Sequence, residues 1–156
     1  MKPKAYLETT IISYLTAASS RDVVIAGHQQ ITRNWWDRRS RFELYVSAAV
    51  VDEVARGDVA VARRRLAVLH DLPVLDLSAG VHQLAARLIS KRAVPAPALV
   101  DAVHIAVAAV NEIDYLLTWN CRHIANAAVR GKIEETCRAE GLRAPVICTP
   151  EELMEI

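Results

Sequence analysis

Short apolar runs alternate with longer segments in which apolar residues recur at helical spacing, and this alternation covers the whole chain. Runs of four to six apolar residues predict buried strands, and the recurring spacing predicts helices. Strands alternating with helices in this way indicate a parallel sheet covered on both faces, so the predicted class is α/β with three layers. The predicted strands are residues 4–8, 42–47, 73–77, 114–118 and 145–148. The predicted helices are residues 9–15, 21–40, 48–56, 58–71, 78–92, 97–110 and 120–140, and a further helix start follows Thr149.

The segment 97–110 is the most apolar of the predicted helices. Pro97 suits a first helical position, and from Leu99 onward the only polar residues are Asp101 and His104, one turn apart on the same face. A helix this apolar belongs inside a protein, where a carboxylate is costly without a cation, hydrogen-bond donors or a metal as its partner. The alternative is an acid stabilised by the helix dipole beside a hydrogen-bonded core histidine.

Three other oxygen-bearing side chains stand at or near the predicted strand ends. Glu8 ends the first strand, Glu53 lies on the helix after the second, and Asn120 follows the fourth. Ligands of open parallel sheets bind beyond the carboxyl ends of the strands, so these side chains are expected to converge with Asp101. Clustered carboxylates need a neutralising cation, and carboxylate and amide oxygens suit Mg²⁺ or Mn²⁺. The alternatives are a solvated helix residue for Glu53 and a helix N-cap for Asn120.

Length, charge and cysteine content narrow the class of protein. The chain has 156 residues, which predicts a single domain over residues 1–156, and a net charge of +1, which gives no overall basic field. No apolar run is long enough to span a bilayer, and three cysteines without a CxxC pair favour reduced thiols in a cytoplasm. Basic clusters occur at residues 38–41, 63–65 and 91–92, where solvated helix faces are the alternative to nucleic-acid binding.

Four segments together resemble the PIN domain family, including toxin ribonucleases of the VapC type, over essentially the whole chain. They are residues 6–10 (YLETT), 47–57 (SAAVVDEVARG), 101–106 (DAVHIA) and 117–120 (LTWN). Glu8 and Asn120 stand where the family usually has Asp, which lengthens one acid and removes the charge of another. The resemblance implies a three-layer PIN-like fold with a central parallel sheet of four to five strands.

The resemblance also implies a Mg²⁺- or Mn²⁺-dependent endoribonuclease, similar to the toxin of a toxin–antitoxin pair, that hydrolyses RNA phosphodiester bonds. Its expected partners are an RNA substrate, an antitoxin protein and a second copy of the chain in a homodimer. The expected residues are Glu8, Glu53 and Asp101 as metal ligands, Asn120 as an assisting catalytic residue, Thr9 and Thr118 as supports that orient the carboxylates or a metal-bound water, and Arg122 and His123 as contacts to substrate phosphate.

The sequence leaves other functions open. The altered residues Glu8 and Asn120 allow a PIN-like RNA- or protein-binding module that no longer holds metal. A signalling receiver domain is disfavoured because Leu77-Ser78 and Cys148-Thr149 stand where its phosphoacceptor Asp and its Lys would follow the third and fifth strands. A dinucleotide enzyme is disfavoured because the chain has five glycines and no glycine-rich turn after the first strand.

Overall fold

A computed structural model describes residues 1–155, and its centre is a parallel sheet of five strands in the order β3-β2-β1-β4-β5. Every neighbouring pair of these strands is parallel. The predicted strands and sheet are confirmed, although each strand is shorter than expected and β3 has only two residues. The strands are β1 (Lys4–Leu7), β2 (Glu43–Ser47), β3 (Val74–Leu75), β4 (Tyr115–Leu117) and β5 (Val146–Cys148).

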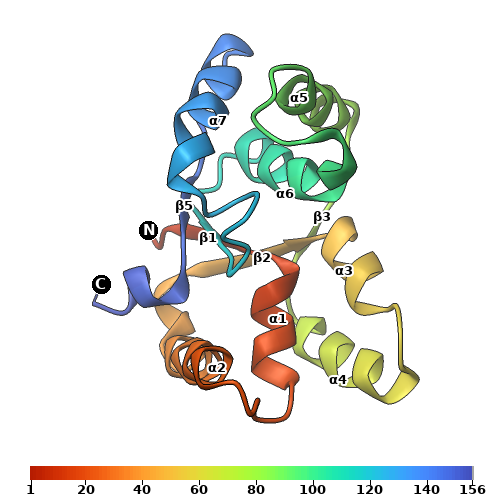
Figure 1. The fold of residues 1–156 in the computed structure, drawn as a ribbon, viewed down its shortest axis with the longest axis vertical. Helices are drawn as coiled ribbons and strands as arrows, with labels where there is room; N and C mark the ends of the chain where they lie inside the picture. Colours follow the sequence, from red (N-terminus) through yellow and green to blue (C-terminus); the bar gives the residue numbers. More distant parts are fainter. Residues whose placement is uncertain (156) are drawn as a thin grey trace.

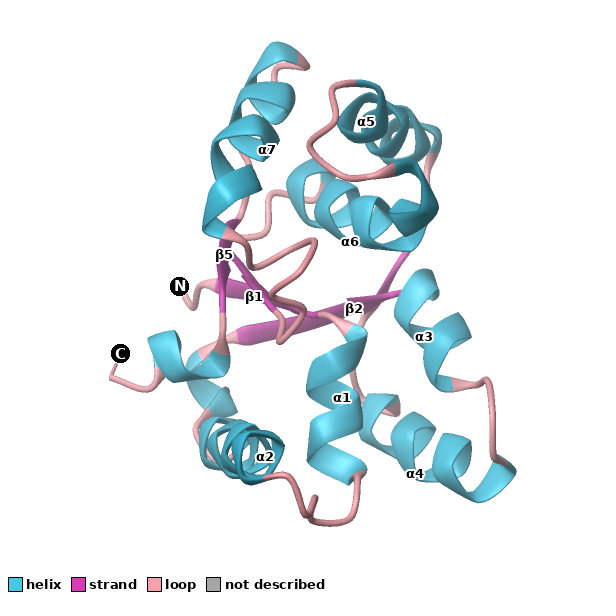
Figure 2. Ribbon diagram, viewed as in Figure 1, coloured by secondary structure: helices cyan, strands magenta, loops and turns pink. Residues whose placement is uncertain are grey.

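Helices cover both faces of the sheet (Figures 1 and 2), which gives the three-layer arrangement. In Figure 1, α5, α6 and α7 lie above the sheet and α1, α2 and α4 below it, while α3 continues from the end of β2. The helices are α1 (Thr9–Thr16), α2 (Val23–Trp36), α3 (Ala48–Val54), α4 (Val59–Leu69), α5 (Ala79–Ser90), α6 (Leu99–Val110) and α7 (Ala127–Ala139).

The predicted buried helix is α6. Every residue from Ala102 to Ala109 is buried, including His104, and Ala5, Tyr6 and Leu7 of the central strand β1 are also fully buried. These side chains belong to one apolar cluster shared by the sheet and its helices. Asp101, in the first turn of α6, is therefore held next to the carboxyl end of the sheet by the packing of the most apolar helix.

Two helix predictions were wrong in their extent, and a third helix start is correct but begins a 3₁₀ turn. The predicted helix 120–140 begins only at Ala127, because the side chain of Asn126 caps it through the N–H of Ala128. The predicted helix 21–40 is α2, which Asp22 caps at its start, followed after Trp36 by a separate 3₁₀ turn at Arg39–Arg41. The helix start at Thr149 has its expected capping box, but the turn it begins, Pro150–Leu153, is 3₁₀.

Candidate active site

The carboxyl ends of the two central strands bring Glu8 and Thr118 side by side. Leu7 of β1 is in register with Leu117 of β4, and the N–H of Glu8 donates to the carbonyl of Leu117 at 3.0 Å. Because α1 begins directly after β1, Thr9 and Thr10 lie at the same edge. Local chain geometry therefore places an acid and three threonines at one point.

Glu8 is buried, with 4% of its surface exposed, and one of its oxygens receives three hydrogen bonds. Oε1 accepts from the N–H of Thr10 at 3.1 Å, from the hydroxyl of Thr10 at 2.5 Å and from the hydroxyl of Thr118 at 2.6 Å. The first of these bonds makes Glu8 the N-cap of α1. Glu8 therefore joins the start of α1 to the end of β4.

Glu53 lies on α3 and turns inward, so the alternative of a solvated helix residue is wrong. Its Oε1 accepts from the hydroxyl of Thr9 at 2.6 Å and pairs with Nε2 of His104 at 2.6 Å. Burial raises the pKa of Glu53, but the hydrogen bonds from His104 and Thr9 together with nearby positive charge bring the pKa below its usual value. The side chain of Glu53 is 31% exposed, so the ionised carboxylate still reaches solvent.

Asp101 is half-buried and is oriented by Asn120. Nδ2 of Asn120 donates to Oδ1 of Asp101 at 3.1 Å, while Oδ1 of Asn120 accepts the backbone N–H groups of Arg122 and His123. Burial raises the pKa of Asp101 above its usual value, and the negative charge of Glu53 adds to this rise. The hydroxyl of Thr118 also accepts the N–H of Asn120 at 2.9 Å. Asn120 thus links Asp101 to the Thr118–Glu8 contact and also closes a turn.

The contacts expected of Thr9 and Thr118 are present, and each of these threonines donates to a different carboxylate. The side chains of Arg122 and His123 make no hydrogen bond to the rest of residues 1–155, although His123 is near enough to Asp101 to lower its pKa. A role for Arg122 and His123 in phosphate binding stays a prediction. Thr10, which also donates its hydroxyl to Glu8, received no role in the sequence analysis.

A buried chain of hydrogen bonds behind Glu53 was also missed. Nδ1 of His104 pairs with the Tyr6 hydroxyl at 2.6 Å, which pairs in turn with Oγ of Ser47 at 2.7 Å. Burial raises the pKa of Tyr6 well above its usual range, so its hydroxyl keeps its hydrogen. The signal in the sequence was the shared helix face of His104 and Asp101, but nothing in it indicated a bond from His104 to Glu53.

The donor chemistry of the site suits a hard divalent cation only in part. Among residues 1–155, no group of three His, Cys, Asp or Glu side chains lies together in a way that could hold a metal ion, so the predicted three-carboxylate group of Glu8, Glu53 and Asp101 is not formed. Glu8 differs from the other two acids in being buried, with 4% of its surface exposed, and its Oε1 serves three donors. Glu53 and Asp101 each use one oxygen for protein donors, which leaves two carboxylates, the number that Mg²⁺ usually takes.

Three aromatic rings from separate segments gather next to this site. The ring of His28 on α2 stacks on Trp119, with centroids 4.0 Å apart and an interplanar angle of 12°, and Tyr14 of α1 lies beside both at 6.3–6.5 Å. The indole N–H of Trp119 donates to the hydroxyl of Thr32 at 2.8 Å. Trp119 stands between Thr118 and Asn120 in the sequence, so its ring joins the α1–α2 layer to the site loop.

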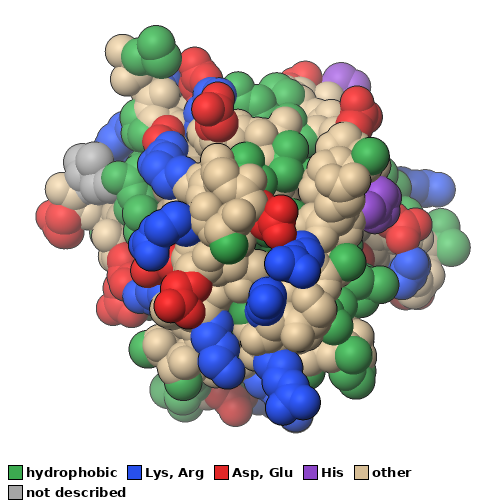
Figure 3. Space-filling model, turned by 90° about the horizontal axis from the view of Figure 1, so that it is seen from above, with side chains coloured by type: hydrophobic (Ala, Val, Ile, Leu, Met, Phe, Trp, Pro, Cys, Tyr) green, Lys and Arg blue, Asp and Glu red, His purple; other side chains and the backbone are tan. Residues whose placement is uncertain are grey.

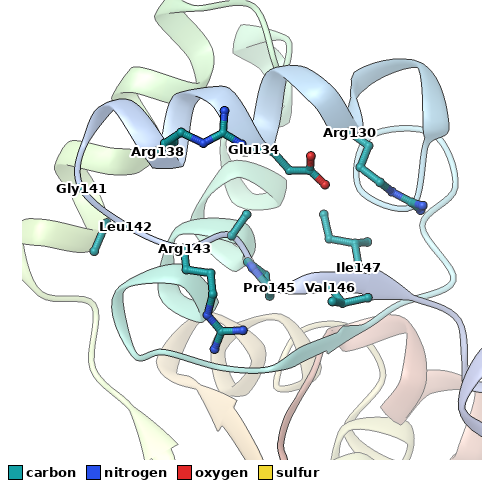
Figure 4. A pocket seen from close by; sticks show the side chains of 10 residues that line it. Arg130, Glu134, Arg138, Gly141, Leu142, Arg143, Pro145, Val146 and Ile147 are labelled. Carbon is teal, nitrogen blue, oxygen red and sulfur yellow. The ribbon is translucent and has the colours of Figure 1, made fainter.

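Open pockets lie beside the site and away from it. Glu53 lines a pocket of about 430 Å³ with Leu99, Val100 and Val103 of α6, whose walls are mostly apolar. A larger pocket of about 710 Å³ lies between α7 and β5 (Figure 4) and contains none of the predicted acids.

The larger pocket is basic. Arg130, Arg138 and Arg143 surround it together with Glu134, and Nε of Arg130 is buried without a hydrogen-bond partner within residues 1–155. Seen from above, the face that carries α5 and α7 shows a broken band of basic side chains with acidic ones between them (Figure 3). None of the three predicted basic clusters lines the larger pocket.

Comparison with known proteins identifies the fold. No family model matches the chain, and no curated protein matches its sequence. Among solved structures, the chain is similar to a chain of the VapBC2 complex from Rickettsia felis bound to a DNA fragment from its promoter. The TM-score is 0.60 at 14% sequence identity, and the match covers 93% of this chain and 97% of the other. The fold is therefore the PIN-like α/β fold that the sequence predicted. No helix within residues 1–155 is long and apolar enough to cross a membrane.

Proposed function

We propose that the chain is a divalent-metal-dependent endoribonuclease of the PIN type, in which Glu53 and Asp101 hold Mg²⁺ or Mn²⁺. The observation that carries the proposal is the pairing of two half-buried carboxylates from α3 and α6 at the carboxyl end of a PIN-like sheet, each with one oxygen held by protein donors. Because the charge of Glu53 raises the pKa of Asp101, a cation shared by the two acids would relieve their repulsion.

In this proposal some residues bind the metal ion and others orient the residues that bind it. Glu53 and Asp101 would hold the divalent cation, which would supply Lewis acidity toward a scissile phosphate and toward the water that attacks it. Asn120 holds Asp101, and Thr9 holds Glu53. Glu8 serves the same purpose indirectly, because its bond to Thr118 fixes the backbone from which Asn120 projects.

The basic pocket between α7 and β5 is the surface we assign to the RNA backbone. Arginine suits phosphate because its planar guanidinium donates two parallel hydrogen bonds. Burial raises the pKa of the Cys148 thiol, and Arg130, which lies near it at the same carboxyl end of the sheet as the acids, opposes part of that rise. Arg138 and Arg143 continue the basic lining toward the start of β5 (Figure 4).

An antitoxin and a homodimer are the protein partners that we propose. The similar chain comes from a structure described as a VapBC2 complex bound to promoter DNA. The apolar pocket beside Glu53, with Leu99 and Val100 exposed on its rim, leaves surface near the acids for a protein contact.

The test is cleavage of a fluorescently labelled single-stranded RNA of mixed sequence by the full chain with Mn²⁺, together with calorimetric titration of Mn²⁺. Asp101→Asn is expected to reduce cleavage to background and to remove the heat of Mn²⁺ binding. Asp52→Asn is the matched control, because Asp52 is the exposed neighbour of Glu53 and, within residues 1–155, pairs only with Arg56. Absence of both cleavage and Mn²⁺ heat in the unmodified chain would overturn the proposal and favour the metal-free binding module.

A further inference from the structure

His104 is fully buried, and both of its ring nitrogens have partners. It lies one turn after Asp101 on α6, so it stands directly behind the proposed site. Nε2 faces Glu53, and Nδ1 faces the hydroxyl of Tyr6. A core histidine could be satisfied by any acceptor, but this one is placed between a carboxylate of the site and a chain of hydroxyls.

The hydroxyls fix which nitrogen carries hydrogen. An ionised Glu53 only accepts, so Nε2 of His104 must be the donor. Oγ of Ser47 accepts the N–H of Ala49 at 3.2 Å, which leaves its own hydrogen free for the oxygen of Tyr6. Tyr6 then donates to a bare Nδ1. In the reverse order, the hydrogen of Ser47 would have no acceptor among the described residues.

We propose that His104 is a positioning residue for Glu53. The Ser47–Tyr6 pair holds the ring with its one hydrogen on Nε2, and Nε2–H acts with the Thr9 hydroxyl to hold Oε1 of Glu53. Two donors on one oxygen fix the carboxylate and leave Oε2 as the oxygen that an external ligand meets. The hydrogen is assigned to Nε2 from the contact geometry, with Glu53 taken as an ionised acceptor. Only the effect on metal affinity rests on the proposed function.

The arrangement resembles the support that surrounds many metal sites, where a partner of the ligand fixes its direction. Loss of such a partner typically costs about 10–100-fold in metal affinity or activity. In this chain the support extends from α6 through Tyr6 of β1 to Ser47, which caps α3, the helix that carries Glu53. His104 at one end of this support therefore contacts the Glu53 carboxylate directly, and Ser47 at the other end caps the helix that carries it.

The first experiment reads the hydrogen positions directly. Long-range proton–nitrogen NMR spectra of the full chain with ¹⁵N-labelled histidine distinguish ring nitrogens that carry a hydrogen from those that do not. The chain has five histidines, and the signals that disappear in His104→Gln are those of His104. The expected result is a bare Nδ1 and a hydrogen-bearing Nε2. Tyr6→Phe should shift the Nδ1 signal. Tyr115→Phe should not, because the phenol of Tyr115, on the adjacent strand β4, makes no hydrogen bond within residues 1–155. A hydrogen on Nδ1 would overturn the proposal.

The second experiment measures Mn²⁺ affinity by calorimetry. His104→Leu, which fills the space without a donor, is expected to weaken Mn²⁺ binding about tenfold or more. His104→Gln places an N–H where Nε2 was and is expected to restore most of the affinity. Equal affinities in His104→Leu and the unmodified chain would overturn the positioning role. If the unmodified chain binds no Mn²⁺, the proposed function fails, but the NMR spectra still show whether Nε2 of His104 donates to Glu53. If His104→Leu does not fold, the spectra of the unmodified chain and of Tyr6→Phe still test that hydrogen bond.

Discussion

Replacing Glu8 by alanine tests whether this carboxylate serves mainly the fold or the chemistry. Its Oε1 accepts three hydrogen bonds, from two groups of Thr10 and one of Thr118, and Thr118 is fully buried. If Glu8 is a structural cap, the variant loses these bonds and becomes less stable. If Glu8 is instead a carboxylate kept only for a metal, its removal from the metal-free protein relieves repulsion and stabilises the fold.

The structure gives the size of the expected loss. A buried donor left without a partner costs about 1–3 kcal/mol, and loss of a helix N-cap costs about 1 kcal/mol. Thr118 is fully buried, whereas Thr10 is only partly buried, so the total should be about 3 kcal/mol. For a chain of this length, that corresponds to a fall in Tm of roughly 6–12 °C.

The assay is urea unfolding of the metal-free protein, with Glu8→Gln as the matched variant. Glutamine keeps an acceptor oxygen but loses the charge, and charge-assisted hydrogen bonds are about twice as strong as neutral ones. Glu8→Gln is therefore expected to lose about half as much unfolding free energy as Glu8→Ala. An alanine variant as stable as the unmodified chain, or more stable, would refute the capping role.

The two acids of the proposed site should respond to pH in opposite ways. Because burial raises the pKa of Asp101, its ionised form destabilises the fold, and Asp101→Asn should raise the unfolding free energy at pH 7 by less than about 1 kcal/mol. That gain should vanish below about pH 4, where the carboxyl is protonated in both states. The pKa of Glu53 is lowered, so its ionised form stabilises the fold. The unmodified chain should therefore be more stable than Glu53→Gln at pH 7, and this advantage should be lost as pH falls below about 4. Urea unfolding across pH measures both variants, and an equal pH dependence of their unfolding free energies would contradict the reasoning. Arg138→Glu in the α7–β5 pocket should weaken RNA binding, and reduce its dependence on salt, more than Arg63→Glu on the surface of α4. Filter binding at two salt concentrations measures both effects, and equal losses of affinity in the two variants would show that this pocket does not bind RNA.

The sheet and the buried helix were predictable because they depend on apolar pattern. The run from Leu99 to Val110 predicted a buried helix, which the structure shows for Ala102–Ala109, and its two polar residues already marked the face that turns toward the site. The ends of β1 and β4 were predictable to within one residue for the same reason, since Glu8 and Thr118 follow apolar runs, whereas β3 is much shorter than predicted. The pattern was less informative where capping decides the structure, as at Asn126, which starts α7 several residues later than the predicted helix.

The contacts within the site were not predictable, because they join residues far apart in the sequence. The bond from His104 to Glu53 spans 51 residues, and the bond from Tyr6 to His104 spans 98. Proximity in the fold was expected for the acids, but the sequence could not indicate that Glu8 would direct one oxygen to Thr10 and Thr118. The direction of a side chain depends on its donors, and those donors come from other elements.

Trp119 gives the chain a built-in optical probe. Its indole lies under the imidazole of His28 and directly precedes Asn120, while the other two tryptophans, Trp35 and Trp36, both lie on α2. With Trp35 and Trp36 replaced by phenylalanine, the remaining emission would come from the loop that orients Asp101. Quenching of this fluorescence, or a shift of its emission maximum, on adding Mn²⁺ or RNA could then be followed in real time without any attached dye.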